Sequence, residues 1–105
     1  MKSKKTIPNY RDYLNLDSLL KSQKLISEKR CKKAHDEMLF VVSHQVYELW
    51  FKQILYEIYS VFEIFKMELV DESQIGTAVS RLHRINKIIQ LLIDQIKIIE
   101  KAKTL

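Results

Sequence analysis

Four side chains that could recognise a flat aromatic ligand follow one another at helical spacing in the middle of the sequence. Phe40, His44, Tyr47 and Phe51 are separated by four, three and four residues, so on a helix they lie along one side. An aromatic wall with one imidazole set into it suits a planar ring that carries one polar atom. The same spacing is also typical of an amphipathic stripe whose aromatics belong to the core and whose histidine has a hydrogen-bond partner. Periodicity alone favours this second interpretation.

The other residues with reactive side chains predict no further site. His35, His44 and His83 are too dispersed for a local metal-ligand spacing, and neither His-Glu-x-x-His nor Glu-x-x-His occurs. Ser43 precedes His44, but neighbouring helical residues point about 100° apart, which argues against a nucleophile and its base. We interpret His35 as part of a helix start, His83 as structural, and the single cysteine, Cys31, as incidental.

Two long helices are predicted to position these residues. The first spans about 36–66, with Asp36 or a neighbour as its cap, and the second spans about 72–101. Asp71 and Gln74, three residues apart, predict a capping box at the start of the second helix. Apolar residues recur at steps of three or four in both. The stripes are Tyr47, Trp50, Ile54, Ile58, Val61 and Phe65, and then Ile75, Val79, Leu82, Ile85, Ile89, Leu92, Ile96 and Ile99.

These elements predict an all-α fold. Gly and Pro occur once each in 105 residues, which leaves little turn chemistry for a sheet. We divide the chain into a basic N-terminal arm with one short helix, residues 1–34, and a long antiparallel hairpin, residues 35–105. Asn15, Asp17 or Ser18 is expected to cap the short helix, which continues through Gln23. The hairpin carries more apolar residues than two helices can bury against each other, so further helices or other subunits are expected to cover it.

The formal charge of +5 comes from the start of the chain. Residues 1–33 hold ten Lys and Arg against three acidic residues, and residues 34–105 hold eight against ten. Because the helical part shows no basic stripe with interleaved aromatics, we expect a solvated arm and no nucleic-acid partner; a polyanion-binding protein is the alternative. No apolar run could span a bilayer, no signal peptide opens the chain, and no membrane partner is expected. One cysteine cannot form an internal disulfide, which favours a reducing, cytoplasmic setting.

Three segments occur in an order and at separations that match one known family. The longest runs from His35 to Gln53 as HDEMLFVVSHQVYELWFKQ. Another begins at Tyr10 as Tyr-x-x-Tyr-Leu-x-Leu-Asp, and the third begins at Val79 as VSRLHR. Together these segments cover roughly residues 9–100 and closely resemble the N-terminal part of the tryptophan 2,3-dioxygenases. A lone Tyr-x-x-Tyr would carry no information, but three ordered segments form a specific signal.

The resemblance implies a haem-dependent reaction that inserts both atoms of O₂ into the indole C2–C3 bond of L-tryptophan and gives N-formylkynurenine, in tryptophan catabolism by the kynurenine pathway. It implies haem b as cofactor and a homotetramer. The position matching His44 is the catalytic histidine, which hydrogen-bonds the indole N–H. The positions matching Phe40, Tyr10, Tyr13 and Leu14 also bind substrate, the last three from a neighbouring subunit. Phe40 and His44 would face the haem on its distal side.

The same resemblance implies that this stretch alone is inactive. In the family, the proximal haem ligand and the arginine that binds the substrate carboxylate lie beyond the position matching Glu100. The sequence also departs from the family at Lys101 and Ala102. We therefore expect part of a longer enzyme or an unusual short relative, without a metal ligand in this segment. A helical oligomerisation module without chemistry is the alternative. The neighbours of His44 are expected to leave it little water.

Overall fold

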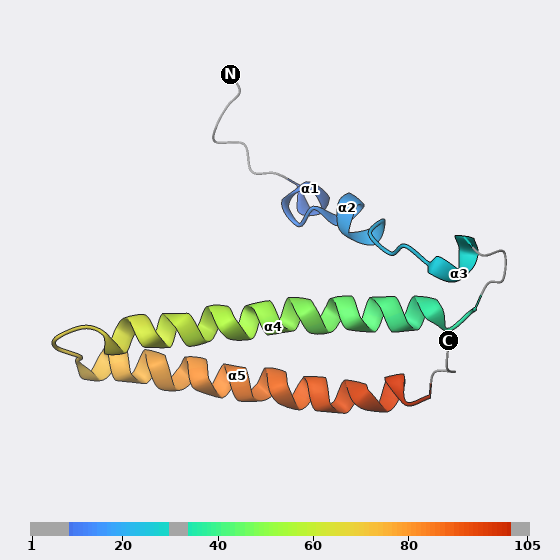
Figure 1. Ribbon diagram of the computed structural model, residues 1–105. Coiled ribbons are helices and arrows are strands. Elements are labelled where there is room, and N and C mark those ends of the chain that lie inside the picture. The colour runs from blue at the N-terminus through green and yellow to red at the C-terminus, as the bar shows by residue number, and fades with distance from the viewer. Residues whose placement is uncertain (1–8, 30–33, 102–105) are drawn as a thin grey trace, which may run out of the picture.

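The computed structural model describes residues 9–29 and 34–101. Within these ranges the chain is helical and has no strand, which confirms the all-α prediction (Figure 1). The helices are α1 Tyr10–Tyr13, α2 Leu16–Leu20, α3 Ile26–Lys29, α4 Glu37–Phe65 and α5 Glu72–Ile99. Cys31 lies outside the described residues. The division of the chain at residues 34 and 35 stays a prediction.

Helices α4 and α5 form the predicted antiparallel hairpin and lie side by side along their length (Figure 1). Their ends fall within two residues of the predicted limits. The capping box is confirmed: Asp71 Oδ1 accepts from the Gln74 N–H at 2.9 Å, and Gln74 Oε1 accepts from the Asp71 N–H at 3.0 Å. Two exposed N–H groups at the start of α5 are thereby satisfied, which fixes where the second helix begins.

The start of α4 is built differently. Asp36 occupies the N-cap position, as predicted, but its side chain makes no capping hydrogen bond. The next residue, Glu37, is only 6% exposed, and its carboxylate accepts from the backbone N–H groups of Ile26 at 2.8 Å and Ser27 at 3.0 Å. The hydroxyl of Ser27 also donates to it. The first turn of α4 therefore holds the start of α3, so a carboxylate from another helix supplies the cap that α3 needs.

The buried stripe of α5 overlaps the predicted one only at Ile85 and Leu92. Its buried residues are Ala78, Ile85, Ile88 and Leu92, whereas Val79, Leu82, Ile89 and Ile96 of the predicted stripe are exposed. On α4, Val61 is buried as predicted, but Ile64 is buried and Phe65 exposed. Each helix has two neighbouring apolar stripes, and periodicity does not tell which of them faces the partner helix.

The N-terminal arm folds into three short helices. Asn15 is the N-cap of α2, as predicted, but α2 ends at Leu20 and does not reach Gln23. Asn9 caps α1 by accepting from the Asp12 N–H at 2.8 Å. Asn15 lies between α1 and α2 with φ 56° and ψ 40°, a left-handed conformation that Asn tolerates better than most residues. This residue turns the chain, and an ion pair between Arg11 and Asp17 joins the two helices across the turn.

The described chain is a flat slab and not a compact domain. Its radius of gyration is 19.6 Å and its extents are 61 × 46 × 18 Å, whereas a compact domain of this length has a radius near 13 Å. Many large apolar side chains are consequently exposed on both faces of the hairpin. No helix in the described part of the chain has the length and hydropathy needed to cross a membrane.

Candidate functional site

The four aromatic residues of the predicted wall form two pairs. The rings of Phe40 and His44 have centroids 4.3 Å apart and are tilted by 37°. Tyr47 and Phe51 are stacked, with centroids 6.0 Å apart and an interplanar angle of 26°. The Tyr47 hydroxyl donates to the backbone carbonyl of Leu92 on α5 at 2.8 Å. This bond uses the Tyr47 hydroxyl hydrogen within the protein. The His44 imidazole is therefore the polar group of the wall that is available to a ligand.

The imidazole of His44 has a defined orientation. Its Nδ1 lies 2.7 Å from the carbonyl oxygen of Phe40, one turn earlier in α4. A carbonyl oxygen can only accept, so Nδ1 carries the hydrogen and, in the neutral ring, Nε2 is left as an acceptor. The Ser43 hydroxyl also donates to the Phe40 carbonyl, at 3.1 Å. The helix backbone therefore selects the tautomer that can receive an N–H donor from a ligand.

His44 lies at the junction of two grooves. The hairpin groove, between α4 and α5, has a volume of about 700 Å³, within the usual range of ligand sites. Its lining is mostly apolar: His44, Tyr47, Glu48, Phe51, Ile54, Ile89, Leu92, Ile93, Ile96, Ile99 and Glu100. The arm groove, between α2 and α4, is lined by Leu19, Ser22, Phe40, Val41, His44, Gln45, Glu48, Leu49 and Lys52. A ring in either groove could reach His44.

In this chain alone the imidazole of His44 is open to solvent. The expectation that it has little water around it concerns the complete enzyme and stays a prediction. Phe40, His44 and Phe51 are all exposed. The reason is geometric: side chains on one helix cover the turn before their own Cα, and they leave the outward side of their neighbours open. Neither groove is closed by a second wall in the described part of the chain. A ligand or further protein must provide the desolvation of this site.

The predicted arm residues do not join this site within one chain. Tyr10 and Tyr13 are 73% and 74% exposed, and Leu14 is exposed as well. None of the three lines the hairpin groove or the arm groove. The arm instead contributes Leu19 and Ser22 to the arm groove. The structure thus brings Phe40 and His44 together and leaves the two tyrosines free to contact something outside this chain.

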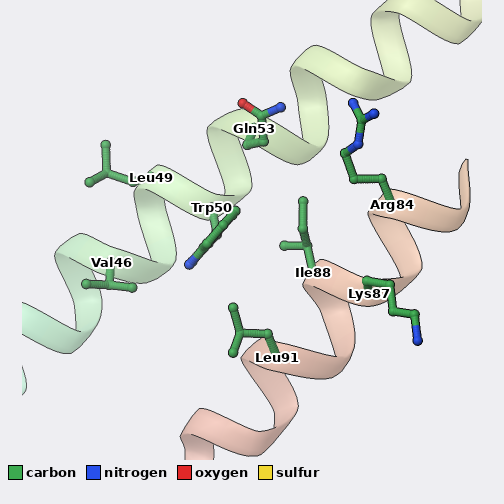
Figure 2. A pocket seen from close by; sticks show the side chains of 8 residues that line it. All are labelled: Val46, Leu49, Trp50, Gln53, Arg84, Lys87, Ile88 and Leu91. Carbon is green, nitrogen blue, oxygen red and sulfur yellow. The ribbon is translucent and has the colours of Figure 1, made fainter. Parts of the chain in front are cut away.

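A third groove lies between the two long helices, and His44 is not among the residues that line it (Figure 2). Figure 2 shows Trp50 of α4 and Ile88 and Leu91 of α5 pointing into the space between the helices. Arg84 and Lys87 stand at the α5 side of this groove and give it a cationic edge. It lacks an imidazole or a carboxylate that could take part in chemistry, so we regard it as a packing surface.

Glu57 is a structural carboxylate whose surroundings shift its pKa. Glu57 is only 3% exposed, and its Oε2 accepts from Arg84 at 2.7 Å and from Gln53 at 2.8 Å. The hydrogen bond from Arg84 lowers the pKa of Glu57 below its ordinary value of 4.5, and this effect exceeds the opposing effect of burial. Glu57 therefore stays ionised between the two helices and holds them together near their middle.

Comparison with known sequences identifies the family to which this chain belongs. The sequence pattern of a family described as tryptophan 2,3-dioxygenase matches residues 2–105. The chain belongs to the tryptophan 2,3-dioxygenase family. It is 53% identical over 92 residues to a tryptophan 2,3-dioxygenase of Xenopus tropicalis, a match that covers 87% of this chain and 23% of that protein.

Family members from distant organisms are similarly close. Tryptophan 2,3-dioxygenase B of Danio rerio is 50% identical over 97 residues, which cover 91% of this chain and 24% of that protein. A tryptophan 2,3-dioxygenase of Alteromonas mediterranea is 52% identical over 91 residues, which cover 87% of this chain and 25% of that protein. The chain spans about a quarter of the length of these relatives.

The tryptophan 2,3-dioxygenase family uses haem, and the residues of this chain fit one face of that group. The hairpin groove offers a long apolar wall with one imidazole at its edge, a lining that a flat aromatic group can pack against. Haem iron also needs an axial ligand. Within the described ranges no group of three His, Cys, Asp or Glu residues could hold a metal ion, and His35 and His83 line neither groove at His44.

The polar contacts that shape the site were not predicted from the sequence. Gln45 and Glu37 reach back to the arm, and Glu57 joins the two long helices. For Glu57 a signal existed, because Trp50, Ile54, Glu57, Val61 and Ile64 follow one another at steps of three and four. A charged residue inside an apolar stripe implies a buried partner. For Gln45 and Glu37 no comparable signal exists, since both lie on a face of α4 with mixed polarity.

Proposed function

We propose that this chain forms the distal, substrate-orienting part of a haem-dependent tryptophan 2,3-dioxygenase. The reaction inserts both atoms of O₂ into the indole C2–C3 bond of L-tryptophan and gives N-formylkynurenine. The observation that carries the proposal is the Phe40–His44 pair, with Nδ1 held by the Phe40 carbonyl and Nε2 left as an acceptor beside an apolar groove. Family membership supports it, because the relatives carry that enzyme name.

In this proposal each residue has a separate task. His44 accepts the indole N–H through Nε2 and thereby fixes the rotation of the substrate ring. Phe40 packs against the substrate ring beside the imidazole. Tyr10, Tyr13 and Leu14 enter the pocket of a neighbouring subunit in a homotetramer, which their exposure in a single chain supports. Haem b, when bound, supplies the oxygen chemistry, and its axial ligand comes from residues other than those described here.

The proposal is tested with the full-length, haem-loaded protein that contains these residues. We expect anaerobically reduced protein to give N-formylkynurenine when L-tryptophan and O₂ are added, as followed by the absorbance of the product. The expected setting is the cytoplasm, where the protein stays reduced. A protein that assembles but shows no Soret band after haem addition would instead be a helical oligomerisation module, for which the exposed apolar faces of the hairpin are suited.

Deleting residues 1–16 should weaken substrate binding more than it destabilises the subunit. The deletion removes Tyr10, Tyr13 and Leu14, all of which are exposed in their own chain. We expect KM for tryptophan to rise at least severalfold, while the melting temperature and the tetramer mass in light scattering change little. A large fall in melting temperature with unchanged KM in the surviving protein would show that the arm is only structural.

A further inference from the structure

The side chain of Gln45, next to His44 on α4, binds the end of the arm. Its Oε1 accepts from Gln23 Nε2 at 2.9 Å. Its Nε2 donates to the Ser22 hydroxyl at 3.1 Å and to the Ser22 carbonyl at 3.3 Å. One amide thus makes three hydrogen bonds to two consecutive arm residues. We call Gln45, Ser22 and Gln23 the amide clamp.

The clamp also terminates α2. The Ser22 hydroxyl donates to the Leu19 carbonyl at 2.8 Å, and Gln23 Nε2 donates to the same oxygen at 3.1 Å. That carbonyl is one of those left without an intrahelical partner at the end of a helix. The same side chains therefore finish α2 and attach it to α4. Leu19 and Ser22 are held as one wall of the arm groove, with Phe40 and His44 on the other side.

A second anchor prevents the arm from pivoting about the clamp. Glu37 holds the N–H groups of Ile26 and Ser27 one turn before Phe40, and Leu25 between the two anchors is 6% exposed. A segment fixed at two points along one helix has a fixed direction. The direction in which α2 and α1 leave α4 is consequently set by side chains of the helix that carries His44.

We propose that Gln45 is a positioning residue for substrate binding. Through the amide clamp it holds α2 beside Phe40 and His44 and sets the direction in which Tyr10 and Tyr13 extend from the subunit. This inference rests on the proposed function, because it assigns the arm tyrosines to a neighbouring pocket. Gln45 contacts neither the substrate nor the haem in this proposal; it acts through the arm.

The experiment measures tryptophan turnover by the haem-loaded, full-length enzyme and its Gln45→Ala and Gln23→Ala variants. We expect KM to rise roughly three- to tenfold in each, from the loss of one to three hydrogen bonds, with kcat within twofold of the wild type. The increase in KM of the double variant should be smaller than the two single effects combined, because both changes break the Gln45–Gln23 bond. Gln90→Ala removes an amide from an exposed position of α5 and serves as the matched control.

A second set of variants tests whether Gln45 acts through the arm or directly on His44. In enzyme that already carries Tyr10→Ala and Tyr13→Ala, Gln45→Ala should raise KM no further. An additional rise of the same size, or a wild-type KM in the Gln45→Ala and Gln23→Ala enzymes, would overturn the inference. If Gln45→Ala does not fold, Gln23→Ala tests the same bond from the arm. Wild-type KM in the double tyrosine variant would instead contradict the role of the arm in the proposed function.

Discussion

Replacing His44 with Ala in the haem-loaded enzyme is expected to lower kcat/KM for L-tryptophan by roughly five- to 150-fold. The change removes the Nε2 acceptor that the Nδ1 bond to the Phe40 carbonyl makes available. The indole N–H then has no partner in the closed pocket, a loss of about 1–3 kcal/mol. Part of the loss should appear in kcat, since the same bond fixes the ring for reaction. Activity should fall without vanishing, because haem still supplies the oxygen chemistry.

Tryptophan methylated on the indole nitrogen tests the direction of this bond. That substrate lacks the N–H, so it should lose most of its disadvantage in the His44→Ala enzyme, where the acceptor is already absent and space has opened. Ser43→Ala is the control at the neighbouring position. It removes a hydroxyl that donates to the Phe40 carbonyl and lies 3.5 Å from His44 Nδ1, and it leaves Nε2 in place. If His44→Ala kept wild-type turnover and still discriminated against the methylated substrate, His44 would not face the indole.

Breaking the ion pair between Glu57 and Arg84 should destabilise the protein by about 1–3 kcal/mol at neutral pH. Arg84→Ala leaves a carboxylate that is 3% exposed and that still accepts a hydrogen bond from the Gln53 amide on α4. The figure stays below that of a fully buried pair because the Arg84 side chain is 56% exposed. Denaturant unfolding of the holoprotein at pH 7 measures the difference. Glu63→Gln is the control, since Glu63 and Lys66 form a pair that is 71% exposed on both sides.

The pH dependence of that contribution follows from the pKa of Glu57. Because the pKa is lower in the folded state than its ordinary value of 4.5, ionised Glu57 favours folding above about pH 4.5. The contribution is lost as the pH falls through the lower, folded-state pKa. The stability difference between the wild type and Glu57→Gln should therefore be largest near neutrality and shrink below pH 4.5. A difference that grew on acidification would contradict this assignment.

The sequence predicts the long helices well because several independent signals agree on them. The Asp71 capping box, the scarcity of Gly and Pro, and apolar residues at helical steps all point to the same two spans. The orientation of those helices about their own axes is harder to predict. Ile85 and Leu92 lie on the predicted stripe, whereas Ile88 and Ala78 do not, and both stripes look equally apolar in the sequence. Which stripe is buried depends on the partner helix.

Some features of the candidate site could likewise be predicted from the sequence, and others could not. The pairing of Phe40 with His44 follows from a spacing of four residues, and the structure confirms it. Tautomer selection by the Phe40 carbonyl depends on a rotamer, which spacing does not determine. The amide clamp depends on contacts between residues 22 or more positions apart, and no local pattern announces it. The roles of Tyr10 and Tyr13 stay predictions, because they concern a second subunit.

The arrangement of cross-links between α4 and α5 has a consequence for how the hairpin closes. Near the connecting turn Val61, Ile64 and Ala78 form a buried cluster, the Glu57–Arg84 pair joins residues 27 apart, and the Tyr47–Leu92 bond joins residues 45 apart. The entropic cost of closing a loop rises with that separation. The contacts near the turn are therefore expected to form first, and the contact of Tyr47 with Leu92 last. His44 lies at the end that closes last and frays first. The pocket is thus placed where local opening is easiest, and a ring entering it would stabilise the loosest part of the hairpin.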